Sequence, residues 1–105
     1  MGKDIPRMTT QTLRVLGAFT TSQPDELSGA EIAKRTGLQS GTLYPILARL
    51  EDAEWLESKW ETGDPRELGR PRRRLYTITG FGAKSARAAY TEVSAMIGGL
   101  QWERP

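Results

Sequence analysis

The sequence predicts a mainly helical domain of the α+β class, in which three helices precede a small β-hairpin and one more helix follows it. Apolar residues recur at helical spacing through the first half of the chain and again near its end. Between them lie two stretches that alternate as strands do, separated by a loop rich in Gly and Pro. A length of 105 residues suits a single hydrophobic core.

The first two helices are marked by their caps. Thr9 or Thr10 suits the N-cap of a first helix, which places Leu13 and Leu16 on one side and Phe19 on a neighbouring one. The motif SGAE, beginning at Ser28, is a capping box and predicts a second helix that ends near Gly37. The residues between these helices contain Ser, Pro and Asp, which suit a turn.

A third helix is expected from about Ser40 to Asp52. Its buried stripe has the spacing i, i+3, i+4, i+7 and consists of Leu43, Ile46, Leu47 and Leu50. Pro45 lacks an N–H and is tolerated best in a first turn. It therefore favours a helix that starts at Gly41 or Thr42, or a slight bend.

The alternating stretches predict a hairpin followed by a last helix. Residues 55–61 and 72–79 form its two strands, with Arg74, Tyr76 and Ile78 on one face of the second strand. Thr79 suits the N-cap of a final helix, which runs to about Ile97 before two glycines end it.

Composition excludes several classes of function. The chain has no Cys and no His, so neither disulfides nor His-dependent nucleophilic catalysis is available. We predict no enzyme activity, no metal site and no cofactor. No apolar run approaches the roughly 18 residues of a membrane span, and no signal-peptide pattern precedes the first helix. These features favour a protein of the cytoplasm.

The order of elements is that of a winged helix-turn-helix. In such a fold the third helix enters the major groove of DNA, with its N-terminal residues nearest the bases. The face opposite the leucine stripe presents small residues, hydroxyl groups and one basic side chain. The predicted contacts of this recognition helix are Ser40, Thr42, Tyr44 and Arg49.

The loop of the hairpin concentrates positive charge in a chain whose net charge is only +2. Arginine suits bidentate contact with phosphate, so a basic wing indicates binding to the DNA backbone. A merely solvated charge run is the alternative. Strand alternation turns Arg72 and Arg74 away from Arg73. The predicted wing contacts are Arg66, Arg70, Arg72, Arg73 and Arg74.

The last helix carries an a/d seam with spacings of 4, 3, 4 and 3. This seam favours a symmetric homodimer, which would match a palindromic operator. The alternative is that this face only covers the domain's own core. The seam comprises Ala86, Tyr90, Val93, Ile97 and Leu100, and Met96 widens it.

Two segments together resemble the PadR family of bacterial transcriptional regulators. They are SGTLYPILARLEDAEWLESKWE and GRPRRRLYTITGFG. The resemblance implies a winged helix-turn-helix homodimer of the bacterial cytoplasm that usually represses by binding operator DNA at the nucleoid. Residues 1–79 would form the DNA-binding domain, with the wing at about 55–78, and residues 80–105 the dimerisation helix and tail.

The resemblance also implies site residues. In the wing it adds Gly69 and Pro71 to the DNA-facing arginines. In the dimer it pairs the last helix with the first helix through Leu13, Leu16 and Phe19. Glu54 stands where family members usually have Gly; if its φ is positive, Glu costs about 1 kcal/mol there.

Two further possibilities are open at the level of sequence. Some family members sense aromatic small molecules, and Trp55, Trp60 and Trp102 could line such a site, although tryptophans more often pack in cores.

A winged-helix protein-interaction module without a DNA role is the alternative function. It is favoured by acidic residues near the junction of recognition helix and wing, namely Asp52, Glu54, Glu57 and Glu61.

Overall fold

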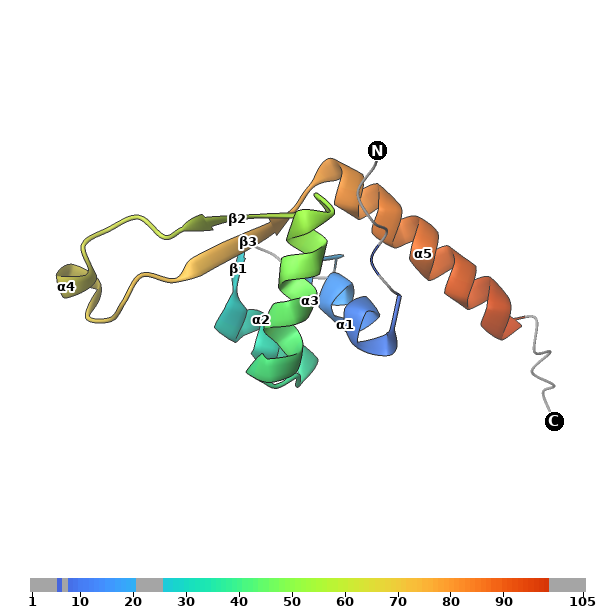
Figure 1. Cartoon of the computed structure of the whole chain (residues 1–105), viewed down its shortest axis with the longest axis horizontal. Coiled ribbons are helices and arrows are strands. Elements are labelled where there is room, and N and C mark those ends of the chain that lie inside the picture. The colour runs from blue at the N-terminus through green and yellow to red at the C-terminus, as the bar shows by residue number, and fades with distance from the viewer. Residues whose placement is uncertain (1–5, 7, 21–25, 99–105) are drawn as a thin grey trace.

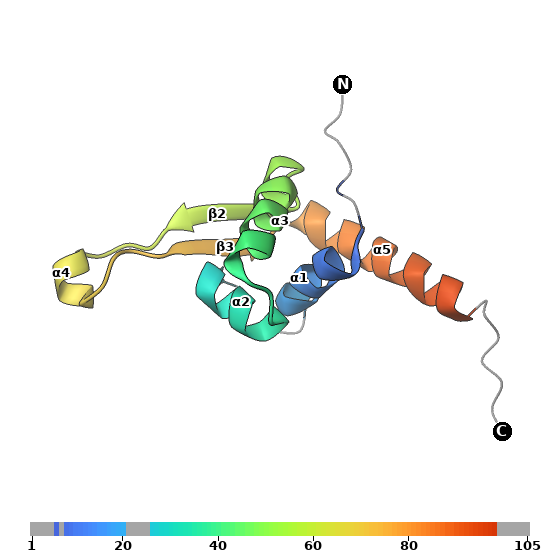
Figure 2. The same ribbon diagram turned by 60° about the horizontal axis from the view of Figure 1, so that its bottom comes forward.

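The computed structural model describes residues 6, 8–20 and 26–98. It confirms the predicted order of three helices, a strand hairpin and a last helix, and adds two short elements. The elements are α1 (Thr10–Thr20), β1 (Leu27–Ser28), α2 (Gly29–Thr36), α3 (Ser40–Asp52), β2 (Leu56–Trp60), α4 (Pro65–Leu68), β3 (Arg74–Ile78) and α5 (Gly80–Gly98). Helices α1, α2 and α3 cluster together, while the β2–β3 ribbon projects to one side and α5 to the other (Figures 1 and 2).

The sheet has three antiparallel strands in the order β1-β3-β2, so the prediction of a two-stranded hairpin is incomplete. The missed strand pairs Leu27 with Tyr76 and Ser28 with Leu75. Both of its residues are buried, and two residues are too short to display alternation. Its pairing places the start of α2 directly beside the base of the wing.

One apolar core joins the helices to the base of the sheet. The predicted stripe of α3 is confirmed, since Leu43, Ile46, Leu47 and Leu50 are all buried. Val15 and Leu16 of α1 and Leu56 of β2 meet this stripe in the same cluster. Among the described residues, no helix is long and apolar enough to cross a bilayer.

The helix caps follow the sequence closely, with one exception. The Ser28 hydroxyl accepts a bond from the Glu31 N–H at 3.1 Å, and the Glu31 carboxylate accepts from the Ser28 N–H at 2.8 Å. Helix α3 spans Ser40–Asp52, which confirms the predicted bounds, but Pro45 lies inside it, so the alternative start at Gly41 or Thr42 is not observed. Pro45 is exposed, which lets water solvate the carbonyl that its missing N–H leaves unpaired.

Helix α4 occupies the segment that was expected to be a loop. Asp64 caps it by accepting a bond from the Arg66 N–H at 3.0 Å, Pro65 begins it and Gly69 ends it with φ 73°. These are ordinary helix signals. They escape a periodicity analysis because the helix has only four residues.

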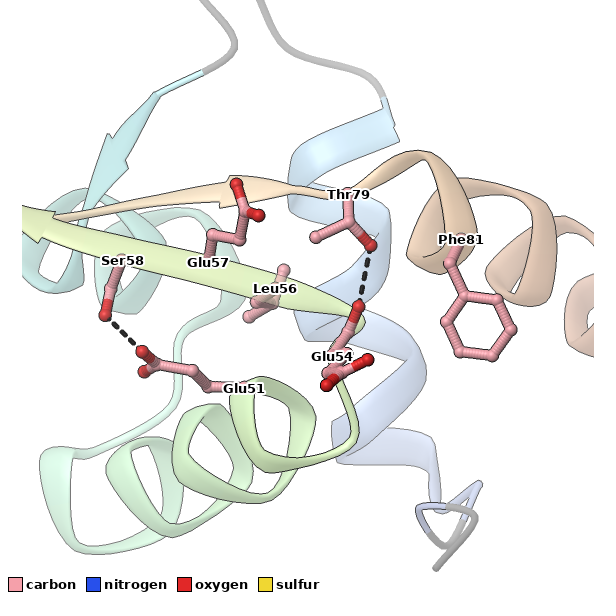
Figure 3. Close-up of a pocket in the computed structure, with 7 residues that line it drawn as sticks. All are labelled: Glu51, Glu54, Leu56, Glu57, Ser58, Thr79 and Phe81. Carbon is pink, nitrogen blue, oxygen red and sulfur yellow. Dashed lines mark hydrogen bonds between the residues drawn. The ribbon is translucent and has the colours of Figure 1, made fainter. Parts of the chain in front are cut away.

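A tight joint connects the end of α3 to the start of α5. The Thr79 hydroxyl donates to the Glu54 carbonyl at 2.7 Å (Figure 3). The Gly82 N–H donates to that hydroxyl at 2.8 Å. Gly82 lies directly on the Trp55 backbone: a Cβ at Gly82 would be 2.7 Å from the Trp55 carbonyl carbon. The Trp55 ring meets Phe81 edge-on, with centroids 6.4 Å apart.

We predict that Gly82→Ala destabilises the fold by about 2–3 kcal/mol, because backbone atoms of Trp55 cannot yield to the added methyl as a flexible side chain could. Gly80→Ala, at a position with open space around it, should change stability by no more than about 0.5 kcal/mol. Urea unfolding of the two variants measures the difference. Equal stability would show that the joint is not tightly packed.

A second prediction concerns Glu54, whose φ of 67° makes it the one non-glycine residue with positive φ in the described ranges 8–20 and 26–98. The backbone thus keeps the conformation that glycine favours. Glu54→Gly should raise the free energy of unfolding by about 1 kcal/mol. Glu54→Ala removes the same carboxylate without relieving the backbone, so it should bring no comparable gain. If both variants gain equally, the carboxylate and not the backbone is responsible.

Candidate nucleic-acid interface

The exposed face of α3 carries the residues predicted for the recognition helix. Ser40, Thr42, Tyr44 and Arg49 are all exposed, opposite the buried leucine stripe. The N-cap, Gln39, makes no side-chain bond to the first turn, so the turn keeps N–H groups free for another acceptor. This end of α3 carries partial positive charge from the helix dipole.

Tyr44 is held in place by α2. A Cβ at Gly29 would be 2.9 Å from Cζ of the Tyr44 ring, so the ring lies across the first residue of α2. The side chain is nevertheless 46% exposed. The phenol therefore lies near the beginnings of both helices of the helix-turn-helix, with its outer face open to solvent.

The distal part of the wing, residues 61–73, is organised by Glu61. The Glu61 carboxylate forms a two-pronged ion pair with Arg70, at 2.7 Å from Nη1 and 2.9 Å from Nη2. The Arg73 N–H donates to the same carboxylate at 3.2 Å. The bonds from Arg70 lower the pKa of Glu61 to about 2, so the carboxylate is ionised throughout the physiological pH range.

The base of the wing is tied to α3 by a second set of bonds. The Ser58 hydroxyl of β2 donates to the Glu51 carboxylate of α3 at 2.5 Å (Figure 3), and Arg74 Nε donates to the Ser58 hydroxyl at 3.0 Å. The Arg74 guanidinium also lies 5.0 Å from the centre of the Trp60 ring, a cation–π distance. Arg74 therefore connects both wing strands to the recognition helix.

The wing arginines fall into two groups. Arg70 and Arg74 are half-buried and hold other protein groups. Arg66, Arg72 and Arg73 are exposed. Arg72 donates from Nε to the Gly63 carbonyl at 2.7 Å, while the side chains of Arg66 and Arg73 form no hydrogen bond or ion pair with another described residue. Gly69 and Pro71, which the resemblance implies as contacts, are also exposed.

The residues that organise the wing were not predicted as a group. Glu51 and Ser58 entered no predicted site, and Trp60 entered only as a candidate wall of an aromatic ligand site. Glu61 entered only among the acidic residues that favoured a module without a DNA role, since acidic groups repel phosphate. Its neutralisation by Arg70 removes much of that objection. The predicted strand alternation placed Arg72 and Arg74 on the same face of the second strand. This does not hold for Arg72, because β3 begins only at Arg74.

The residues predicted for dimerisation are divided between core and surface. Leu16, Phe19 and Ala86 are buried within the single chain, at 2%, 5% and 5% exposure. Leu13 and Val93 are half-buried, whereas Tyr90, Met96 and Ile97 are 66%, 68% and 48% exposed. Leu100 lies outside the described residues.

An apolar groove runs between α1 and α5. It has a volume of about 620 Å³ and is bordered on the α1 side by Leu13, Leu16 and Gly17. Ala83, Ala86 and Tyr90 border it on the α5 side. Beyond this groove α5 continues past α1 (Figure 1), so its last turns carry exposed apolar side chains on one face.

A helix-turn-helix followed by a two-stranded ribbon is the architecture of winged-helix regulators. The sequence matches the transcriptional regulator PadR-like family over residues 25–88, which is more than half of the chain. The protein belongs to this family. The family is one of transcriptional regulators, which agrees with the resemblance seen in the sequence.

Solved structures share the fold at low sequence identity. MepR from S. aureus, in its DNA-binding conformation, is 24% identical with a TM-score of 0.66, over 89% of this chain and 64% of that one. PcaV from Streptomyces coelicolor, in complex with its natural ligand, is 24% identical with a TM-score of 0.69, over 89% and 60%. BpsR from Bordetella bronchiseptica is 18% identical with a TM-score of 0.72, over 94% and 66%.

These structures therefore confirm the predicted winged-helix fold. The chain spans about three fifths of the length of MepR and PcaV. No curated protein matches the sequence.

Proposed function

We propose that the protein binds operator DNA as a homodimer and represses transcription, with α3 in the major groove and the wing along the phosphate backbone. The observation that carries this proposal is the wing: three exposed arginines, Arg66, Arg72 and Arg73, lie on a hydrogen-bonded loop that projects from the helices. DNA attracts such a cluster through release of counterions from its phosphates. A MepR–DNA complex shares the fold, at 23% identity and a TM-score of 0.65.

The recognition helix supplies the second part of the proposal. Gly41, Pro45 and Ala48 are exposed on α3 and have little side chain, so the helix can approach the base edges closely. The hydroxyls of Ser40, Thr42 and Tyr44 lie toward its N-terminal end, where they can donate to phosphates that flank the groove. Arg49 lies about one and a half helical turns beyond Tyr44 and is the basic group of this face.

The homodimer follows from the exposed face of α5. Exposed apolar side chains that gather on one side of a helix mark an interaction surface. We propose that the partner's α5 covers Tyr90, Val93, Met96 and Ile97 and that Leu13 contributes from α1 through the shared groove. Leu16, Phe19 and Ala86 would support this surface from beneath, because they are buried in the single chain.

A twofold homodimer implies a palindromic operator, since each protomer then reads the same half-site. In this proposal residues 1–79 form the DNA-binding domain and residues 80–105 the dimerisation helix and tail. An aromatic effector stays a prediction: Trp55 is buried, Trp60 stacks with Arg74, and Trp102 lies outside the described residues.

The DNA-binding proposal predicts a specific effect of the exposed arginines. With DNA from immediately upstream of the protein's own gene, Arg73→Ala should weaken binding and reduce the slope of log K against log salt by about 1, as expected for one lost phosphate contact. It should weaken binding to unrelated DNA equally. Fluorescence anisotropy at several salt concentrations measures both effects.

Lys84→Ala is the matched control, because it removes the same charge from α5, on the other side of the helical cluster from the wing. It should leave the salt slope unchanged. Equal effects of the two substitutions would indicate only a general influence of net charge. A wild-type protein that binds no DNA at low salt would favour the protein-interaction module.

The homodimer proposal predicts that a charged α5 face dissociates the protein. Met96→Lys combined with Ile97→Lys should lower the mass measured by sedimentation equilibrium from twice 11.7 kDa to 11.7 kDa. Ala88→Lys combined with Ala95→Lys adds the same charge on another face of α5 and should leave the dimer intact. A dimer that survives the first pair would show that this face is not the interface.

A further inference from the structure

Glu61 makes an unusual set of contacts for an acidic residue in a basic wing. Its side chain is 22% exposed, and both carboxylate oxygens are engaged. Oε1 accepts from Arg70 Nη1 and from the Arg73 N–H, and Oε2 accepts from Arg70 Nη2. A charge-assisted, bidentate ion pair of this kind fixes the relative orientation of the two side chains and also attracts them more strongly than a neutral hydrogen bond does.

These contacts join both ends of the loop that connects β2 to β3. Glu61 directly follows β2, and Arg73 directly precedes β3. The Glu61 N–H donates to the Arg73 carbonyl at 2.8 Å, so main-chain and side-chain bonds close the loop at the same place. Arg70 reaches this point from just beyond α4, so its ion pair also fixes the far side of the loop.

The exposed arginines lie within or beside this closed loop. Arg66 is on α4, and Arg72 donates a hydrogen bond to the Gly63 carbonyl across the loop. The backbone N–H of Arg73 donates to the Glu61 carboxylate, while the Arg73 side chain is exposed. The loop that Glu61 closes thus carries all three exposed guanidinium groups. The guanidinium of Arg70, whose side chain is 33% exposed, is already paired with the carboxylate.

We propose that Glu61 is the positioning residue of the wing, and that Arg70 is its tether and not a DNA contact. The proposal rests on the proposed DNA-binding function and differs from the sequence prediction that Arg70 touches DNA. An ordered loop loses less conformational entropy on binding. An acidic residue therefore strengthens the binding of a polyanion by holding the basic residues in place.

The proposal reverses the sign expected from charge alone. Glu61→Gln removes a negative charge from a surface that meets phosphates, so simple electrostatics predicts tighter binding. The positioning role predicts binding that is about tenfold weaker, because the free loop then loses conformational entropy when it becomes ordered on DNA. Glu67→Gln is the matched control: Glu67 is exposed on α4 of the same wing, and its substitution should leave affinity unchanged or increase it.

The experiment measures the affinity of the full-length protein for the upstream DNA fragment by fluorescence anisotropy. The variants are Glu61→Gln, Glu67→Gln, Arg70→Gln and the double variant at 61 and 70. If Arg70 acts only through Glu61, the double variant should bind DNA no more weakly than whichever of the two single variants has the lower affinity. Binding by Glu61→Gln that equals or exceeds wild type, or additive losses in the double variant, would overturn the proposal.

Two further measurements need no DNA. In wild type the carboxyl ¹³C signal of Glu61 should titrate near pH 2, and in Arg70→Gln its midpoint should move toward 4.5. Nitrogen-15 relaxation should show faster motion of residues 62–72 in Glu61→Gln, while the thermal midpoint changes little. Unchanged relaxation would contradict the tether. These measurements also separate the two proposals, because a wing that loosens in a protein that binds no DNA would overturn only the DNA-binding function.

Discussion

The close contact of Gly82 with the backbone of Trp55 is the constraint on which the arrangement of the whole molecule depends. Because glycine has no Cβ, the first turn of α5 lies directly against the chain that leaves α3. The Thr79 hydroxyl bonds to both sides of this contact. The direction of α5 is therefore set relative to α3, and a positive φ at Glu54 is the local conformation that makes the turn possible.

This joint matters for function because the two ends of the molecule have different tasks in the proposed dimer. If α5 pairs with its copy, the joint determines the distance and angle between the two copies of α3. The wing is connected to the same end of α3 through Glu51, Ser58 and Arg74. Recognition helix, wing and dimerisation helix thus meet within a few residues, so a displacement of α5 would move both DNA-binding elements together.

Local chemical signals explain which features could be predicted from the sequence. The capping box at Ser28, the leucine stripe of α3 and the cap at Thr79 act between residues three or four apart, and all are present. Strand β1 was missed because its pairing with β3 depends on contacts almost fifty residues away. The tether between Glu61 and Arg70 was missed because a loop has no periodicity from which to infer which side chains face each other. The sequence therefore predicted Arg70 to be exposed and to contact DNA like the other wing arginines.

Hydroxyl-radical footprinting of the upstream DNA tests most directly whether the protein acts as a twofold DNA-binding regulator. The proposed dimer should protect two symmetric half-sites whose centres are separated by about 10–10.5 base pairs or a multiple of that distance. Each half-site should carry an additional protected stretch of backbone from the wing. A single asymmetric footprint, or uniform protection without half-sites, would contradict a dimer whose two recognition helices are set by the joint between α3 and α5.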